Sequence, residues 1–199
     1  MKKSNLIIVA IAITGLLTQS CTKDRIEGMG EIDTMILQVE PFNGIAQEGA
    51  SDVYISYGET QEVKVTGHPN IISRIETDVI NGVWFIELEN GNYSDYELTF
   101  YLTMPVLNEA SSSGSGNIHV TQFDNQPELE INIYGSGSFM GYPIQVADCR
   151  IRIEGSGECE VNVTEELDVA IKGSGNIYYK GHPRITTDIK GSGTLISSN

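Results

Sequence analysis

From about residue 125 to residue 199, apolar and polar positions alternate in short runs that recur at nearly equal intervals. Alternation with a period of two puts successive side chains on opposite faces of a strand, so each run predicts a half-buried β-strand. A Gly-Ser-Gly tripeptide follows each run. It occurs five times, at spacings of 21, 20, 18 and 18 residues, beginning at Gly114, Gly135, Gly155, Gly173 and Gly191.

The apolar positions align when the repeats are superimposed on this motif. Two residues before it stand four isoleucines, Ile133, Ile153, Ile171 and Ile189. A unit of about 20 residues cannot bury an apolar face alone, whereas parallel stacking of equivalent units buries a continuous column. We therefore predict an all-β fold, a β-helix or β-solenoid with about five rungs of 18–21 residues. The general preference of parallel crossovers favours the right-handed form.

Glycine on both sides of each serine predicts a sharp corner between strands. Glycine tolerates a positive φ and the close approach of another backbone, and the serine hydroxyl can bond nearby backbone groups. The glycines predicted to have this structural role are Gly114, Gly116, Gly135, Gly137, Gly155, Gly157, Gly173, Gly175, Gly191 and Gly193.

Residues 36–105 show looser alternation, and Gly49-Ala50-Ser51 resembles a degenerate earlier copy of the corner. We expect strands and hairpins in this N-terminal β region to cap the first end of the solenoid. Residues 106–199 would form the repeat β-helix, and residues 36–199 together one continuous domain.

The N-terminus has the pattern of an export signal. Lys2 and Lys3 precede a nearly unbroken apolar run from Leu6 to Leu17, which is shorter than the roughly 20 residues that span a bilayer. Residues 1–20 are therefore predicted to be a signal peptide rather than a membrane anchor.

The residues that follow resemble the lipobox of bacterial lipoproteins, Leu17-Thr18-Gln19-Ser20-Cys21. We predict lipidation of Cys21, with membrane attachment through the lipid, and the alternative is an ordinary secretory signal. Residues 21–35 are polar and lack periodicity, which predicts a flexible tether. The expected location is the cell envelope, as an outer-membrane lipoprotein on either its periplasmic or its surface side.

Composition excludes several functions. With 12 basic and 27 acidic side chains the net charge is −15, and a polyanion such as nucleic acid would be repelled. The Gly-Ser-Gly motif lacks the third glycine and the helix of a dinucleotide fingerprint. The three histidines, His68, His119 and His182, have no metal-ligand spacing. No cofactor and no metal are predicted.

Two kinds of side chain are candidates for chemistry. Cys149 and Cys159 fall at inward positions, either as buried thiols or, since the chain is exported, as a disulfide. A carboxylate pair could support glycoside hydrolysis. Nothing in the sequence fixes the separation of the candidate carboxylates, which are Asp52, Asp95, Glu97, Asp124 and Glu158.

Tyrosines are the better functional resource, because tyrosine offers rigid contact area with a polar tip. Tyr134 and Tyr178 fall at outward positions and are the candidate binding face, although packing at strand edges is the simpler interpretation.

Three segments and the repeats carry a resemblance to a known family. The segments are Phe42-Asn43-Gly44-Ile45, Gly49-Ala50-Ser51-Asp52-Val53 and Thr103-Met104-Pro105-Val106-Leu107. Together with the repeats they are similar to the auto-transporter adhesin, head GIN domain family, over most of residues 36–196. The resemblance implies a right-handed β-helix-like domain on exported lipoproteins of Bacteroidetes-type bacteria, and it brings no catalytic residues.

We therefore expect a non-enzymatic, lipid-anchored, adhesin-like module that recognises a glycan or an envelope or host protein through an exposed β-helix face. The alternative is a periplasmic carbohydrate-active enzyme or a small-lipid-binding protein on the same scaffold. The oligomeric state stays open.

Overall fold

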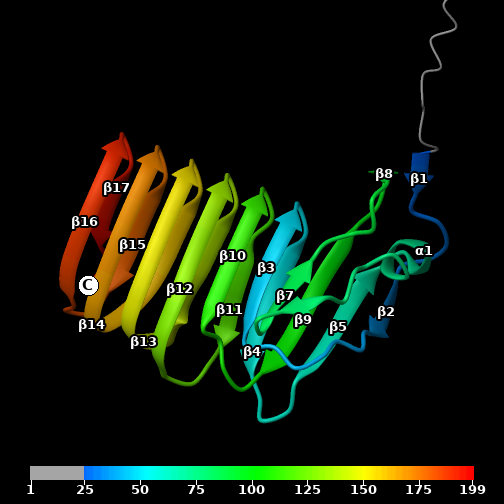
Figure 1. Cartoon of the computed structure of the whole chain (residues 1–199), viewed down its shortest axis with the longest axis horizontal. Coiled ribbons are helices and arrows are strands. Elements are labelled where there is room, and N and C mark those ends of the chain that lie inside the picture. Colours follow the sequence, from blue (N-terminus) through cyan, green and yellow to red (C-terminus); the bar gives the residue numbers. More distant parts are fainter. Residues whose placement is uncertain (1–24) are drawn as a thin grey trace, which may run out of the picture.

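The computed structural model describes residues 25–199, so the predicted export segment and Cys21 lie outside it. The described chain is all-β apart from one short helix. It forms a strongly curled, mixed 15-stranded sheet and a separate two-stranded sheet, β1–β8 (Figure 1). The elements are β1 (Arg25–Glu27), β2 (Asp33–Ile36), β3 (Gly44–Gly49), β4 (Asp52–Tyr57), β5 (Glu62–Gly67), α1 (Pro69–Ile72), β6 (Val79–Ile80), β7 (Val83–Ile86), β8 (Asn92–Ser94), β9 (Leu98–Met104), β10 (Glu109–Gly114), β11 (Ile118–Gln122), β12 (Gln126–Gly135), β13 (Ser138–Gly155), β14 (Glu158–Gly173), β15 (Asn176–Lys180), β16 (Arg184–Gly191) and β17 (Thr194–Ser197).

Successive Gly-Ser-Gly intervals pair in parallel with equivalent residues opposite each other. Ile153 lies opposite Ile171, and Ile171 lies opposite Ile189. Both Ile153 and Ile171 are fully buried. The predicted column of stacked isoleucines is therefore confirmed, and its burial contributes favourably to folding.

The corners need glycine at both positions, for two different reasons. Gly155 has a φ of 139°, a conformation that residues with a Cβ rarely adopt. Gly157 does not have a positive φ, but a Cβ there would lie 2.2 Å from the carbonyl oxygen of Gly137. The carbonyl oxygen of Gly135 accepts hydrogen bonds from the N–H groups of Ser156 at 2.8 Å and Gly157 at 3.2 Å. The backbones of adjacent repeats thus meet directly at the corner.

The stack begins earlier in the chain than the first Gly-Ser-Gly. Gly114 pairs with Gly49, whose carbonyl oxygen accepts the N–H groups of Ser115 and Gly116 at 2.9 and 3.0 Å. The Gly49-Ala50-Ser51 segment is therefore an earlier copy of the corner, as its sequence predicts.

In these first intervals the isoleucine column gives way to polar side chains. Ser112 and Gln47 occupy it, both buried. The hydroxyl of Ser112 donates to Oε1 of Gln47 at 3.2 Å, and Nε2 of Gln47 donates to the carbonyl oxygen of Ser51 at 2.8 Å. Buried polar groups are tolerated here because they satisfy one another.

Antiparallel strands close the N-terminal end of the stack. β5 pairs antiparallel with β9 and with β2, and α1 lies beside β5 at the same end (Figure 1). On the other face of the curled sheet, β7 pairs antiparallel with β6. We call this end, with its short antiparallel strands, the capped end of the stack.

The prediction of a flexible tether over residues 21–35 is wrong where the structure describes it. Arg25–Glu27 pairs with β8 and Asp33–Ile36 pairs with β5. Ile26 is half-buried against the core. The Asn70 side chain fixes the segment by donating to the carbonyl oxygen of Glu27 at 2.8 Å and accepting the N–H of Met29 at 2.8 Å. Strands this short show no alternation in the sequence.

Candidate functional site

The curled sheet has two outward faces, and the two predicted tyrosines lie on different ones. Tyr134 is on β12, opposite Ser113 and Glu154. Tyr178 is on β15, opposite Glu160 and Ile196. A Gly-Ser-Gly corner separates the strands before it from those after it, so the two tyrosines do not form one surface.

We call the two surfaces the trough face and the ladder face. The trough face is the outward side of the strands that precede the corners, β7, β3, β10, β12, the second half of β13, the second half of β14, and β16. The ladder face is the outward side of the strands that follow them, β9, β4, β11, the first halves of β13 and β14, β15 and β17.

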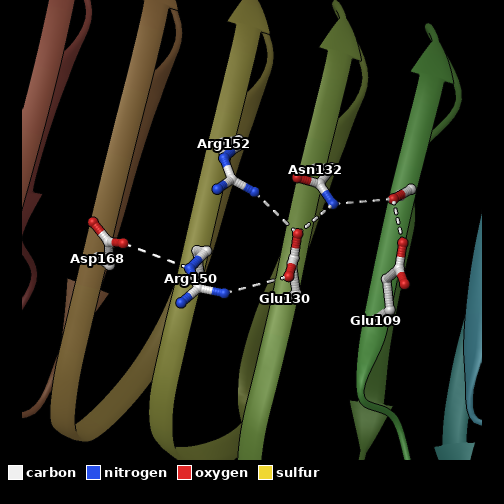
Figure 2. Close-up of polar contacts among 7 residues, drawn as sticks. Glu109, Glu130, Asn132, Arg150, Arg152 and Asp168 are labelled. Carbon is white, nitrogen blue, oxygen red and sulfur yellow. Dashed lines mark hydrogen bonds and ion pairs between the residues drawn. The ribbon is translucent and has the colours of Figure 1, made fainter.

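Charged side chains pair across the strands of the trough face (Figure 2). Oε1 of Glu130 accepts from Nη1 of Arg152 at 3.1 Å and from Nδ2 of Asn132 at 3.2 Å, and its Oε2 lies 3.6 Å from Nη1 of Arg150. Nε of Arg150 lies 3.5 Å from Oδ2 of Asp168. These pairs are about half exposed, so each contributes only about 0.2–1 kcal/mol. Their effect is to fix the side chains beside Asn132.

A hollow of about 560 Å³ lies next to this network, over β7, β3, β10 and β12. We call it the trough. Small residues, Ala46 and Ser111, lie opposite each other in its middle. Phe85 on β7 lines one side and Tyr134 on β12 the other, 37% and 47% exposed. Neither ring packs against another aromatic ring within residues 25–199. Both rings are therefore partly exposed beside the hollow, and no aromatic ring stacks on them.

Hydrogen-bonding groups surround the floor of the trough. The hydroxyl of Ser111 donates to Oε1 of Glu109 at 3.3 Å and accepts from Nδ2 of Asn132 at 3.5 Å. Asn132 is 7% exposed, and its Oδ1 has no hydrogen-bond partner in the described chain. A buried amide oxygen without a hydrogen-bond donor is uncommon in proteins. Oδ1 of Asn132 is therefore an unsatisfied acceptor beside the trough.

Two carboxyl groups at the rim, Glu48 and Glu87, are hydrogen-bonded to each other. The pKa of Glu87 is raised above its usual value, first by partial burial, then by that hydrogen bond and by the negative charges of Glu76, Glu48 and Asp78. The carboxyl pairs of glycosidases are separated by about 5 Å or more to admit the sugar or a water. A pair in direct contact does not fit that chemistry.

The carboxylates considered in the sequence lie on separate elements. Asp52 on β4 accepts from Nδ2 of Asn117 at 3.0 Å, and Asp95, after β8, forms an ion pair with Arg25 at 3.4 Å. Glu158 begins β14. Glu97 precedes β9 and Asp124 follows β11. In residues 25–199 no group of three or more His, Cys, Asp or Glu side chains is placed to hold a metal ion.

On the ladder face, three rings stack across adjacent strands. The ring of Tyr54 lies 5.4 Å from that of Tyr101 at 15°, and 4.7 Å from that of His119 at 12°. Rings that stack on one another cover their own faces and leave their edges to solvent. This row therefore stabilises the strand pairing and is a poorer platform for a ligand than the trough.

The two cysteines of the repeat region are free and buried. Cys149 lies opposite Leu167 and Cys159 opposite Phe139, so the thiols belong to different columns. Burial raises the pKa of Cys149 to about 12 and that of Cys159 well above its usual value. Neither thiol is a nucleophile at neutral pH.

The sequence pattern predicts that Tyr134 points outward, but it does not predict that Phe85 and Asn132 line the same hollow. The outward position of Phe85 can be read from alternation in its strand. Its place across from Tyr134 depends on the order of β7, β3, β10 and β12 in the sheet, which no local pattern encodes.

Within residues 25–199 no helix combines the length and the apolar character needed to cross a bilayer.

Two solved structures are similar to this chain, and the first shares its fold. A putative adhesin from Bacteroides fragilis is 20% identical, with a TM-score of 0.56 over 86% of this chain and 99% of that chain. A putative lipid binding protein from Parabacteroides distasonis is 21% identical, with a TM-score of 0.49 over 88% of this chain and 100% of that one. No curated protein matches the sequence.

A family model matches residues 41–141 and, in a second copy, residues 125–183. The matched residues cover well over half of the chain, from the strand that contains the first corner to the end of β15. The matched residues include the three segments and most of the repeats that carry the resemblance. The chain belongs to the family described as "Putative auto-transporter adhesin, head GIN domain".

Proposed function

We propose that this protein is a non-enzymatic, adhesin-like module of the bacterial cell envelope that binds a glycan in the trough. The observation that carries the proposal is the pair of exposed, unstacked rings of Phe85 and Tyr134, on either side of a floor of small and polar residues.

This arrangement suits a sugar better than a flat protein surface. The C–H face of a pyranose packs against an aromatic ring, and its hydroxyls both donate and accept hydrogen bonds. Glu109, Ser113 and Glu48 offer such groups around the hollow. A volume of about 560 Å³ also lies in the range of small-ligand sites, whereas a stable protein interface buries roughly 800 Å² on each partner.

The proposal includes attachment to the membrane through lipid on Cys21. Supporting it are the apolar run before Cys21 and the position of Arg25 in the fold. β1, which contains Arg25, lies at the capped end of the stack and far from β16 and β17 (Figure 1). A lipid just before it would hold the capped end at an outer membrane and leave the rest of the stack accessible.

We also interpret the five Gly-Ser-Gly intervals as rungs of a right-handed β-helix. Support comes from the in-register parallel pairing of β12, β13, β14 and β16, and from the general handedness of parallel crossovers.

A glycan array tests the binding function. Residues 22–199, which contain every described strand and the whole described core, would be compared with a Phe85→Ala/Tyr134→Ala variant. We expect the variant to lose at least about tenfold in affinity, since each ring contributes on the order of 1 kcal/mol. Tyr178→Ala, a matched loss of one tyrosine on the ladder face, should bind normally. Equal binding by the double variant and the unchanged protein would rule out the trough.

A further inference from the structure

The C-terminal end of the stack finishes in a long unpaired edge. β16 pairs with β14 along one edge, and no strand within residues 25–199 pairs with its other edge. All of its residues are exposed. Ile185 and Ile189, at core positions, are 38% and 39% exposed, whereas Ile171 in the preceding interval is fully buried. An unpaired edge beside an apolar row is a ready template for another strand.

The N-terminal end limits what can occupy this edge. Its unpaired edge strands, β2 and β6, are four and two residues long, so neither matches the eight residues of β16 in a head-to-tail contact. A contact between two C-terminal ends needs no second surface. It joins the same patch on both subunits and closes after two copies, as in most soluble dimers.

The outward charges of β16 are self-complementary in one antiparallel alignment. The alternating outward positions hold Arg184, Thr186, Asp188 and Lys190. Centring a two-fold axis on Thr186 puts Arg184 of each copy opposite Asp188 of the other, so two pairs of opposite charge form. Opposite charges directly across strands stabilise pairing, and like charges oppose it.

We propose that the C-terminal edge binds a second copy of this chain, β16 against β16, antiparallel and centred on Thr186. The continuous sheet pairs the free backbone groups of residues 184–188 of both copies and covers the exposed Ile185, which then lies opposite Thr187. Because the two-fold axis is perpendicular to the sheet, the trough faces of both copies point to the same side.

One consequence rests on the proposed function. Two troughs on one side of a dimer bind a repetitive glycan with avidity, since the second contact becomes intramolecular. The dimer itself does not depend on glycan binding, so each proposal can fail without the other.

Charge-reversal variants of residues 22–199 test the dimer. Analytical ultracentrifugation of the unchanged protein over a range of concentrations should show a reversible monomer–dimer equilibrium. Arg184→Asp puts Asp opposite Asp188, and Asp188→Arg puts Arg opposite Arg184, so each variant alone should be monomeric. An equimolar mixture of the two restores both opposite-charge pairs and should form a heterodimer.

The mixture separates pairing from misfolding. Arg184 also contacts Glu166, and Lys190 contacts Asp188, so each variant disturbs its own subunit as well. Those disturbances remain in the mixture, whereas the contact across the axis is repaired. Lys64→Asp makes the same charge change at the capped end and should still dimerise. A protein that stays monomeric at every concentration, or a mixture that stays monomeric, would falsify the proposal.

Discussion

The carbonyl oxygen of Gly135 occupies the space where a side chain on Gly155 would begin, 2.2 Å from the position of that missing Cβ. Gly155 also has a φ of 139°. We expect Gly155→Ala to lower the free energy of unfolding by about 2–4 kcal/mol, through strain and loss of the corner hydrogen bonds. Ser156→Ala, at the exposed position next to it, should change stability by less than about 0.5 kcal/mol. Urea unfolding of both variants measures the difference, and equal losses would contradict the packing of the corner.

The two outward faces should respond to aromatic substitutions in opposite ways. Tyr54→Ala removes the central ring of the stack with Tyr101 and His119, so we expect a loss of stability on the order of 1 kcal/mol with glycan affinity unchanged. Tyr134→Ala should weaken glycan binding and leave the unfolding midpoint nearly unchanged. The same two variants, tested in both assays, check this assignment. Loss of binding in Tyr54→Ala with no change in stability would move the site to the ladder face.

Cys149 and Cys159 should resist alkylation in the folded protein and react after unfolding in urea, with mass spectrometry counting the labelled thiols. Burial raises both pKa values, so the folded state keeps the protons that the unfolded state releases. The stabilisation is present at neutral pH and decreases as the pH rises through 9.0, the ordinary value for the unfolded thiol. Rapid labelling of the native protein at pH 8 would contradict this.

Cys159→Ser replaces a fully buried thiol by a hydroxyl without a hydrogen-bond partner. We expect a loss of about 1–3 kcal/mol in the free energy of unfolding. Cys159→Ala serves as the control, because it leaves a small cavity but no unpaired hydroxyl. A serine variant more stable than the alanine variant would indicate that water or a backbone group reaches the site.

The contact between Glu48 and Glu87 should make the folded protein less stable as the pH rises, whereas an ionised carboxylate in an ion pair would make it more stable. A raised pKa means that the folded protein holds the proton of Glu87 more tightly than the unfolded chain, so ionisation at neutral pH costs stability. Glu87→Gln should therefore raise the unfolding temperature slightly at pH 7, and its advantage should disappear as the pH falls below 4.5, the ordinary value. Glu128→Gln, which makes the same change at an exposed carboxyl on β12, serves as the control in the thermal scans.

The parts of the fold that repeat were predictable, because burial in a stack imposes the same demand on every interval. Ile153 and Ile171 could be aligned on the motif alone, and they pair as expected. Gln47 and Ser112 break the column with polar residues that satisfy each other, and nothing in a hydrophobic pattern anticipates such a pair. The short strand at Arg25–Glu27 depends on the side chain of Asn70, more than 40 positions away.

The candidate site was less predictable than the core. Tyr134 could be assigned to the surface from alternation, and so could Tyr178, but the corner between their strands puts them on different faces. The trough exists because Ala46 lies opposite Ser111 and leaves room between the larger side chains on either side. That arrangement arises from the order of strands in the sheet rather than from any one segment.

The repeated corner also bears on how such chains change length. The carbonyl oxygen of Gly135 accepts the N–H of Ser156, and that of Gly155 accepts the N–H of Ser174, both at 2.8 Å. Removal of residues 156–173 would join Gly155 to Ser174 and recreate an existing junction, and duplication of the same stretch would do likewise. Gene rearrangements that gain or lose one whole interval can therefore shorten or extend the molecule while every surviving interface keeps its partner.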